Sequence, residues 1–214
     1  INIGTLNKNT IPSMFLAGKK ANELGHIVLL DPVGAGASRL RTDTANRLMQ
    51  EVRFDAVRGN ISEIKTLCTG SGSTKGVDAD AVDAVTEANL DDGVQLVKTF
   101  AQRAGCIVAV TGAIDLVSDG ERCWCIRNGR AEMSRITGTG CQLSALMTAF
   151  LVANPDHKLD AAAAAVCMMG LAGEIGWANM QPGDGNSTYR NRIIDAIFNM
   201  TGDALEKGAK YELR

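Results

Sequence analysis

The sequence predicts an α/β fold of three layers (α/β/α), in which helices cover both faces of a mainly parallel central sheet. Short apolar runs rich in β-branched residues alternate along the chain with longer stretches of helical character. This alternation is typical of parallel strands that are joined by helices. The 214 residues contain no internal repeat and no clear boundary between domains. We therefore expect one domain spanning residues 1–214.

The first half of the chain is expected to alternate between strand and helix. Its opening, INIG, has the composition of a core strand but no Met or polar lead-in, so we expect a natural N-terminal segment before it. Thr42 or Asp43 is placed to cap the second expected helix, and Ser62 lies near the cap of the third. The expected strands are residues 1–4, 26–31 and 55–60, and the expected helices are residues 12–24, 42–52 and 62–67.

The second half is expected to begin with a loop and to end in helices. The stretch Cys68–Asp80 is rich in Gly, Ser and Thr, which predicts a surface loop. Asp-Gly and Asn-Gly pairs indicate hairpin turns near the strands that follow. We expect a helix over residues 92–104, strands over residues 106–112, 115–120 and 122–129, and helices from Gly138 onward, interrupted at residues 154–158 and 181–187.

The charge pattern argues against several classes of partner. The formal net charge is −2, and the basic residues form no block that would follow a phosphate backbone or a membrane surface. The longest apolar stretch, Ala161–Gly173, is too short to cross a bilayer and predicts a buried helix. No signal-peptide pattern is present. We expect a cytoplasmic protein that binds neither nucleic acid nor membranes.

The six cysteines do not have the spacing of a zinc site. None belongs to a C-x-x-C pair, and the two histidines lie far from them in the sequence. Cys123 and Cys125 flank Trp124 in an expected strand, which places both thiols on one face. We expect reduced thiols in or near the core.

Four apolar runs end in polar turns, most of them rich in glycine, with the sequences LLDPVGAG, VRGN, AVTG and RITGTGC. In open α/β sheets, ligands bind beyond the carboxyl ends of the strands. We therefore expect these turns to meet at one edge of the sheet and to form the functional site there.

The last of these turns contains Gly138, Thr139, Gly140 and Cys141 and leads into an apolar helix. The glycines allow backbone N–H groups to turn inward, and the positive end of the helix dipole points to the same place. This combination predicts an anion hole that stabilises a transferring phosphoryl group. A tight turn with no ligand is the alternative. Taken alone, Cys141 fits a nucleophile, a redox group, a ligand or a small packing residue.

The other turns add two acids, an arginine and a threonine. Pro32 biases Asp31 toward an extended conformation, so Asp31 is expected at the end of its strand, near the crevice. Arg58 is suited to a nucleotide phosphate, and Glu63 to a magnesium ion held directly or through water. Thr111 offers a hydroxyl to a phosphate. Structural explanations also exist: an Asp31 bonded to its own loop, a Glu63 favoured by the helix dipole, and a Thr111 that caps a turn.

An anion hole, two acids for a metal and an arginine are the parts needed for phosphoryl transfer to an alcohol, where positioning and charge neutralisation dominate. They match neither a Walker A motif nor the protein-kinase signature. His26 and His157 are expected in exposed positions, so a histidine-based triad is not predicted.

Five segments resemble, in order, the motif series of the hydroxyethylthiazole kinase family, which belongs to the ribokinase-like superfamily. They are DPVGAGASRLRT, RGNISEI, KGVDA, VTGAIDLVSDG and TGTGCQLSAL. The resemblance runs from INIGTL to the C-terminal helices, and only the late stretch PGDGNSTYR matches loosely. Other members of the superfamily commonly have aspartate where this chain has Cys141, whereas the thiazole kinases are similar to this chain in carrying cysteine.

The resemblance implies phosphorylation of the primary hydroxyl of 4-methyl-5-(2-hydroxyethyl)thiazole, with ATP as co-substrate and Mg²⁺ as cofactor, in thiamine biosynthesis or salvage. Carried over by motif, Arg58 and Thr111 contact ATP, and Gly138 contacts the thiazole through its backbone. Asp31 and Glu63 match the magnesium-associated acids of the family.

The resemblance further places Cys141, with Thr139 and Gly140, at the catalytic loop. It implies a homotrimer with active sites between subunits, and thiazole-pocket residues in a segment that precedes Ile1. We expect Cys141 to contribute modestly, because a thiolate is a mediocre base and a dissociative transition state gains little from base catalysis.

Three other functions remain open at this point. A ribokinase-like kinase for a pyrimidine or pyridoxal-type alcohol would usually have aspartate at position 141. A nucleotide-binding regulatory protein without turnover would not need Asp31, Arg58 and Glu63 together. A thiol-redox protein that uses Cys141 would need a resolving cysteine, and none is close in the sequence.

Overall fold

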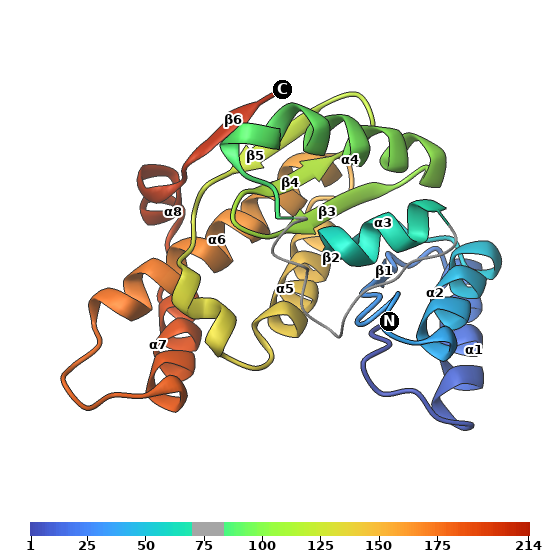
Figure 1. Cartoon of the computed structure of the whole chain (residues 1–214), viewed down its shortest axis with the longest axis horizontal. Coiled ribbons are helices and arrows are strands. Elements are labelled where there is room, and N and C mark those ends of the chain that lie inside the picture. Colours follow the sequence, from blue (N-terminus) through green and yellow to red (C-terminus); the bar gives the residue numbers. More distant parts are fainter. Residues whose placement is uncertain (70–83) are drawn as a thin grey trace.

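The computed structural model describes residues 1–69 and 84–214, and in this part of the chain a six-stranded sheet lies between two layers of helices (Figure 1). The three-layer α/β/α arrangement is therefore confirmed. The strands are neighbours in chain order: β1 (Leu29–Leu30), β2 (Ala56–Asn60), β3 (Ile107–Thr111), β4 (Asp115–Ser118), β5 (Cys123–Ile126) and β6 (Tyr211–Leu213).

The sheet is mixed, and the parallel arrangement that we expected holds for its first half. Strands β1, β2 and β3 are parallel, whereas β3 to β6 are antiparallel to one another in turn. The physical reason lies in the connections. Only Gly112, Ala113 and Ile114 separate β3 from β4, and a parallel pair needs a crossover of a dozen or more residues.

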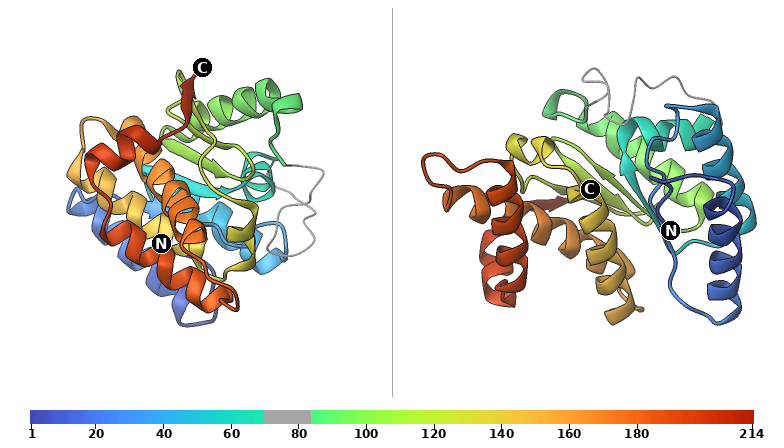
Figure 2. Two further views of the ribbon diagram at one scale, coloured as in Figure 1. Left: turned by 90° about the vertical axis from the view of Figure 1, so that its left-hand side faces the viewer. Right: turned by 90° about the horizontal axis from the view of Figure 1, so that it is seen from below.

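Each face of the sheet buries its own apolar cluster. Figure 2 shows the ribbon of the sheet and its helices from two further directions. Leu30, Val57 and Val108 face one layer, and their neighbours Leu29 and Ala56 face the other. The first layer consists of α1 (Thr10–Glu23), α2 (Arg39–Glu51), α3 (Ile61–Thr69) and α4 (Leu90–Ala104). The second consists of α5 (Thr139–Ala153), α6 (Lys158–Ala178), α7 (Asn186–Phe198) and α8 (Gly202–Gly208). Two short 3₁₀ helices, η2 (Glu87–Asn89) and η3 (Ala131–Arg135), precede α4 and α5.

The opening INIG, expected as a strand, pairs beside the end of β1 only through an isolated bridge and is not one of the six strands. Asn2 forms a parallel bridge with Asp31. On either side of Asn2, the Ile3 amide donates to the Asp31 carbonyl (3.1 Å) and the Asp31 amide donates to the Ile1 carbonyl (2.9 Å). Ile3 is fully buried. This pairing places Asn2 directly beside Asp31.

The predicted cap of α2 was wrong. The helix begins at Arg39, and the hydroxyl of Ser38 accepts the Arg41 amide (3.3 Å). Thr42 lies inside the first turn instead, where its buried hydroxyl accepts the Gly36 amide (2.9 Å). The sequence supplies several capping residues close together, and the loop before the helix decides which of them caps it.

Ser62 lies near the cap of α3, as expected, but Asn60 is the residue that caps the helix. The Asn60 side chain accepts the Glu63 amide, and the Glu63 carboxylate accepts the Asn60 amide, both at 2.8 Å. This reciprocal pair is a capping box built on asparagine. Ser62 is buried within the helix.

Other differences concern short or undescribed segments. Strand β6 was missed, because its three residues are too short to show a period in the sequence. Cys68 and Thr69 belong to the end of α3. The rest of the predicted loop, like the KGVDA motif, lies outside the described residues.

The apolar stretch expected in a buried helix forms part of α6. Within the part of the chain that the structure describes, α6 alone is long and apolar enough to cross a membrane by length and composition. However, 72% of its apolar window is buried inside the protein, as in the core helix of a globular fold. Cys123 and Cys125 are both buried on one face of β5, as expected, while Trp124 packs on the other.

Candidate active site

The four polar turns meet at one edge of the sheet, as expected from the sequence. Asp31 follows β1, Arg58 lies in the middle of β2, and Thr111 ends β3. The start of α5 joins them, because Ser144 in its second turn donates a hydrogen bond to Asp31. Residues far apart in the sequence are thus brought together at the carboxyl ends of the parallel strands.

Asp31 is buried, and its two carboxylate oxygens differ sharply in their surroundings. Oδ2 accepts hydrogen bonds from the Ser144 hydroxyl (2.7 Å) and from the Asn2 amide (3.0 Å). The Arg58 guanidinium lies 3.7 Å from the same oxygen. Oδ1 is buried and has no hydrogen-bond partner among the residues that the structure describes. An unsatisfied buried carboxylate oxygen is costly, so it marks a place where a ligand or cation fits.

Arg58 connects three of the turns. Its Nη2 donates to the Thr111 hydroxyl (2.7 Å), and its Nη1 faces Asp31. The guanidinium also lies against Gly140, where an added Cβ would come within 2.6 Å of Nη1. Glycine at position 140 is therefore needed for this close approach. The arrangement presents a cation directly beside the glycine-rich turn.

The glycine-rich turn has the features of an anion hole. Gly138 is the N-cap of α5 and adopts a left-handed conformation, with φ of 95°. The first amide that bonds back to the turn is that of Gln142, which donates to the Gly138 carbonyl (2.9 Å). The N–H groups of Thr139, Gly140 and Cys141 have no acceptor among the described residues. They stand at the positive end of the α5 dipole, where an anion is favoured.

Cys141 lies at the surface, in the first turn of α5. Its sulfur is 3.3 Å from the Asn2 amide nitrogen, which donates to it. Cys68 is half-buried, and the remaining four thiols are buried. Cys141 is therefore the thiol that reagents and substrates reach most easily.

Glu63 joins two of the turns. Its Oε1 accepts the Gly34 amide (2.7 Å), and its Oε2 accepts the Asn60 amide (2.8 Å). Burial raises the pKa of the Glu63 carboxyl, and these backbone hydrogen bonds together with the charge of Arg58 act in the opposite direction. Both oxygens already hold backbone donors, so Glu63 suits contact with a cation through water better than direct ligation.

The donor set fits a magnesium ion that is held mainly by a substrate. Among residues 1–69 and 84–214, no group of three His, Cys, Asp or Glu side chains could enclose a metal. Magnesium usually binds one or two protein carboxylates and completes its octahedron with waters and phosphate oxygens. The free Oδ1 of Asp31 and the nearby Glu63 match that requirement.

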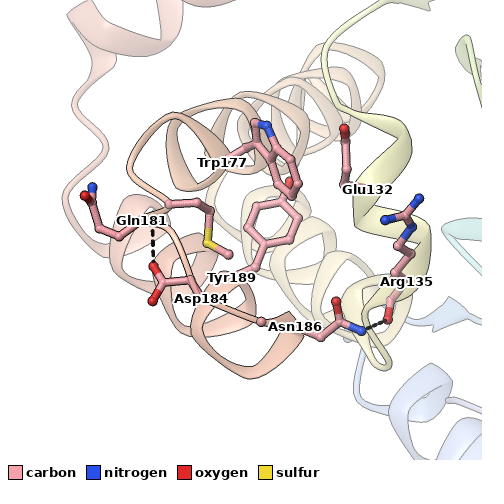
Figure 3. A pocket seen from close by; sticks show the side chains of 9 residues that line it. Glu132, Arg135, Trp177, Gln181, Asp184, Asn186 and Tyr189 are labelled. Atoms are coloured by element: carbon pink, nitrogen blue, oxygen red, sulfur yellow. Dashed lines mark hydrogen bonds between the residues drawn. The ribbon is translucent and has the colours of Figure 1, made fainter.

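A pocket of about 290 Å³ adjoins the segment that leads into the glycine-rich turn. Its wall on one side is η3 with Arg135, and on the other side the α6–α7 connection (Figure 3). Trp177 and Tyr189 meet edge to face with ring centroids 5.3 Å apart. The Asn186 side chain connects the two walls, because it donates a hydrogen bond to the Arg135 carbonyl (3.1 Å).

Comparison with known proteins identifies the family. A model of the hydroxyethylthiazole kinase family matches residues 1–203. This chain belongs to the hydroxyethylthiazole kinase family.

Individual members of the family agree with this assignment. The hydroxyethylthiazole kinase of Clostridium acetobutylicum is 53% identical over 99% of this chain and 78% of its own length. That of Clostridium beijerinckii is 46% identical, over 99% of this chain and 75% of its own length. The structure of a hydroxyethylthiazole kinase protein from Pyrococcus horikoshii superposes with a TM-score of 0.85 at 31% identity, covering 100% of this chain and 76% of that one.

A more distant structure shows how widely the fold is shared. Pyridoxal kinase from Staphylococcus aureus, in complex with AMP-PCP and pyridoxal, matches with a TM-score of 0.59 at 17% identity, over 98% of this chain and 70% of that one. At this identity the match supports the ribokinase-like fold only. The predicted family and enzyme class are confirmed by the family model and the named relatives, and the predicted fold by the solved structures.

Sequence reasoning missed three residues of the site. Ser144 lies three positions after Cys141 on α5, so helical spacing was a usable signal. Asn2 gave no signal, because its position beside Asp31 depends on how INIG pairs with β1. Asp115 begins β4 and accepts the Gly112 amide (2.8 Å). Burial raises the pKa of Asp115 to about 7, although the Gly112 hydrogen bond and the charge of Arg58 oppose this.

Proposed function

We propose that this chain transfers the γ-phosphoryl group of ATP to the primary hydroxyl of 4-methyl-5-(2-hydroxyethyl)thiazole, as a cytoplasmic enzyme of thiamine biosynthesis or salvage. Membership of the family supplies the activity and the substrate. The observation that carries the site is the buried, unpartnered Oδ1 of Asp31, in a carboxylate that contacts α5 and Arg58. The Asp31 carboxylate can therefore hold a cation that binds a phosphate, and the Arg58 guanidinium can bind the phosphate itself.

The chain's own groups have distinct tasks in this transfer. Arg58 and Thr111 bind phosphate oxygens of ATP, and the N–H groups of Thr139, Gly140 and Cys141 stabilise the charge on the transferring group. The substrate oxygen bonds to the γ-phosphorus while the bond from that phosphorus to the β–γ bridging oxygen breaks. The electron pair leaves with ADP. The backbone of Gly138 contacts the thiazole.

Magnesium fits beside Asp31, with Glu63 acting through water. When bound, it neutralises charge on the ATP phosphates. Asp31 contributes a carboxylate that Ser144 and Asn2 hold in one orientation. Arg58, close to the same carboxylate, limits the build-up of negative charge before ATP arrives.

Cys141 is the acceptor of the hydroxyl proton in this proposal. Because the transition state is dissociative, proton removal contributes little to the rate, so Cys141→Ala should lower kcat by only about tenfold. Cys141→Asp should retain or raise activity. Loss of all turnover in both folded variants would instead indicate obligatory thiol chemistry.

The nucleotide base is proposed to bind in the pocket beside Arg135. This pocket adjoins the loop that ends in the anion hole, and its lining includes Trp177 together with polar side chains. Such a mixture of flat apolar and polar surface suits a purine. Arg135→Ala should therefore raise the KM for ATP more than the KM for the thiazole.

The active site is proposed to lie between subunits of a homotrimer. Cys141 begins a stripe on α5 that continues through Ala145, Ala149 and Val152, all of them exposed. An exposed apolar stripe on a helix favours a protein partner. A second copy seated on it would reach the catalytic loop and help to enclose the thiazole.

The proposed function is tested by measuring ADP release with hydroxyethylthiazole, hydroxymethylpyrimidine and pyridoxal as separate acceptors, using the full chain. We expect kcat/KM for the thiazole to exceed that for either other acceptor by at least about 100-fold. A site whose hydrogen bonds fit one substrate strongly rejects others. ATP binding without turnover on any alcohol would favour a regulatory protein. Equal use of pyridoxal would indicate another kinase of this fold.

A further inference from the structure

We infer that Asn2 is a positioning residue for the phosphoryl transfer. It holds the Cys141 thiol and the Asp31 carboxylate in fixed positions relative to each other. The inference rests on the function proposed above. Asn2 lies in none of the glycine-rich turns, but in the opening INIG. Its side chain is exposed at the same edge of the sheet as the site.

The backbone fixes where Asn2 stands. Its bridge to Asp31 is flanked by two hydrogen bonds that join Ile1 and Ile3 to the same residue. Ile3, its neighbour, is fully buried and anchors the segment in the core. The side chain of Asn2 therefore starts from a rigid position beside the catalytic carboxylate.

A backbone donor fixes which way the amide of Asn2 faces. The Gly4 amide donates to Asn2 Oδ1 at 2.7 Å. Because a backbone N–H only donates, this contact assigns the oxygen to that side and the NH₂ group to the other. The NH₂ group then donates to Asp31 Oδ2 at 3.0 Å and to Cys141 Sγ at 3.3 Å. Two donors thus meet two acceptors on different elements.

This arrangement has a consequence for both partners. Asn2 and Ser144 together occupy Oδ2 of Asp31, which leaves Oδ1 free for a ligand. The sulfur of Cys141 accepts from Asn2, so it is held near Asp31 instead of rotating toward solvent. Asn2 touches neither ATP nor the reacting hydroxyl in this scheme, and it acts through Cys141 and Asp31.

The kinetic test uses Asn2→Asp in the full chain. Aspartate keeps the size of the side chain and the oxygen that accepts from Gly4, but it removes both donors. We expect kcat to fall about 20-fold while the KM for ATP stays within about threefold, because ATP contacts other residues. Asn2→Ala, which adds no charge, should lower kcat in the same way.

Asn22 provides a matched control. Its amide also clamps the chain, since it bonds to both the N–H and the carbonyl of Arg53 at 2.8 Å, away from the glycine-rich turns. Asn22→Ala should lower the melting temperature and leave kcat unchanged. An equal fall in kcat for Asn22→Ala and Asn2→Ala would show that loss of any asparagine that fixes the backbone lowers kcat. That result would overturn the inference.

A double-mutant comparison separates positioning from general structure. In a Cys141→Ala background, Asn2→Asp should lower kcat by less than about threefold, because only the contact with Asp31 is left for it to act through. The same 20-fold loss in both backgrounds would overturn the link to Cys141.

A measurement without ATP or magnesium tests the contact itself. A hydrogen bond donated to sulfur stabilises the thiolate, which is the form that attacks iodoacetamide. Alkylation of Cys141, followed by mass spectrometry, should be at least about threefold slower in Asn2→Asp and unchanged in Asn22→Ala. An unchanged rate in Asn2→Asp would overturn the proposed contact. Because this readout needs no turnover, it remains informative if the chain fails to phosphorylate the thiazole, which would refute only the proposed function.

Discussion

Two aspartates at opposite ends of the parallel strands show how this sheet separates stability from function. Asp55 precedes β2, and both of its oxygens have partners: Oδ2 accepts the Val28 amide (2.9 Å) and Oδ1 pairs with Lys158 (2.6 Å). Asp31 follows β1, and its Oδ2 accepts two hydrogen bonds. Its Oδ1 has no donor among the described residues. One carboxylate completes the fold, and the other is left ready for a ligand.

The polar groups around Asp55 are paired, whereas those around Asp31 include donors without an acceptor among the residues that the structure describes. Asp55 and Lys158 line a hollow of about 480 Å³, but their charges neutralise each other there. Near Asp31, the N–H groups at the start of α5 have no acceptor in the described part of the chain. A hollow with paired charges has little to offer an anion, whereas unpaired donors beside an arginine attract one. Open volume is therefore a poorer guide to function here than unsatisfied polar groups.

The largest expected contrast comes from replacing each aspartate with asparagine. Asp31→Asn should lower kcat by about 1,000-fold, because it removes the charge that is proposed to face magnesium, with little change in the free energy of unfolding. Asp55→Asn should lower the free energy of unfolding by about 1–2 kcal/mol and leave kcat within about threefold. Steady-state kinetics and urea unfolding of both variants check this. The reverse pattern would break the comparison.

A smaller contrast is expected between two glycines. Gly140→Ala places a Cβ 2.6 Å from Arg58 Nη1, so the guanidinium must move away from the proposed phosphate site. We expect kcat/KM for ATP to fall about 100-fold. Gly202→Ala, where an added Cβ meets nothing within 4 Å among the described residues, should leave kinetics unchanged. If both variants behave alike, the close approach at position 140 has no functional role.

Two arginines sharpen the comparison further. Arg58→Lys keeps the charge but loses the planar fork that reaches both Thr111 and Asp31, so the KM for ATP should rise about tenfold. Arg53 lines the hollow beside Asp55 and serves as the control. Arg53→Lys should leave the KM for ATP unchanged. An equal rise in both variants would point to a general effect of surface charge.

The smallest effect concerns the pH dependence of stability near the site. Burial raises the pKa of Asp115 from 3.8 to about 7, so between these values the folded protein binds more protons at this carboxyl than the unfolded chain does. Stability should therefore fall as pH rises from about 4 to 7, with a slope of at most about 1.4 kcal/mol per pH unit from this group. Asp115→Asn should flatten that part of the profile in urea unfolding experiments. An unchanged profile would show that Asp115 is ionised throughout.

Much of the fold and of the site could be predicted from the sequence, because the signals are local. Apolar runs that end in polar turns identify the strand ends, and the topology of a parallel sheet brings those ends together. Asp31, Arg58, Thr111 and the turn at Gly138 were found in this way. Their contacts to ATP and magnesium stay predictions.

The remainder depended on pairing between distant segments. Asn2 contacts Asp31 and Cys141 only because INIG lies in parallel register with β1, and register has no local signature in four residues. Similarly, Ser38 caps α2 because of the loop before it, although Thr42 has comparable propensity. The antiparallel half of the sheet was underestimated, since short turns decide strand direction more strongly than composition does.

The most direct test of the account is how magnesium affects the binding of AMP-PCP to the full chain, measured by calorimetry in wild type and in Asp31→Asn. If the free Oδ1 of Asp31 receives the magnesium of the bound nucleotide, magnesium should tighten binding by at least about tenfold in wild type and have almost no effect in Asp31→Asn. An equal tightening by magnesium in both proteins would contradict the central claim.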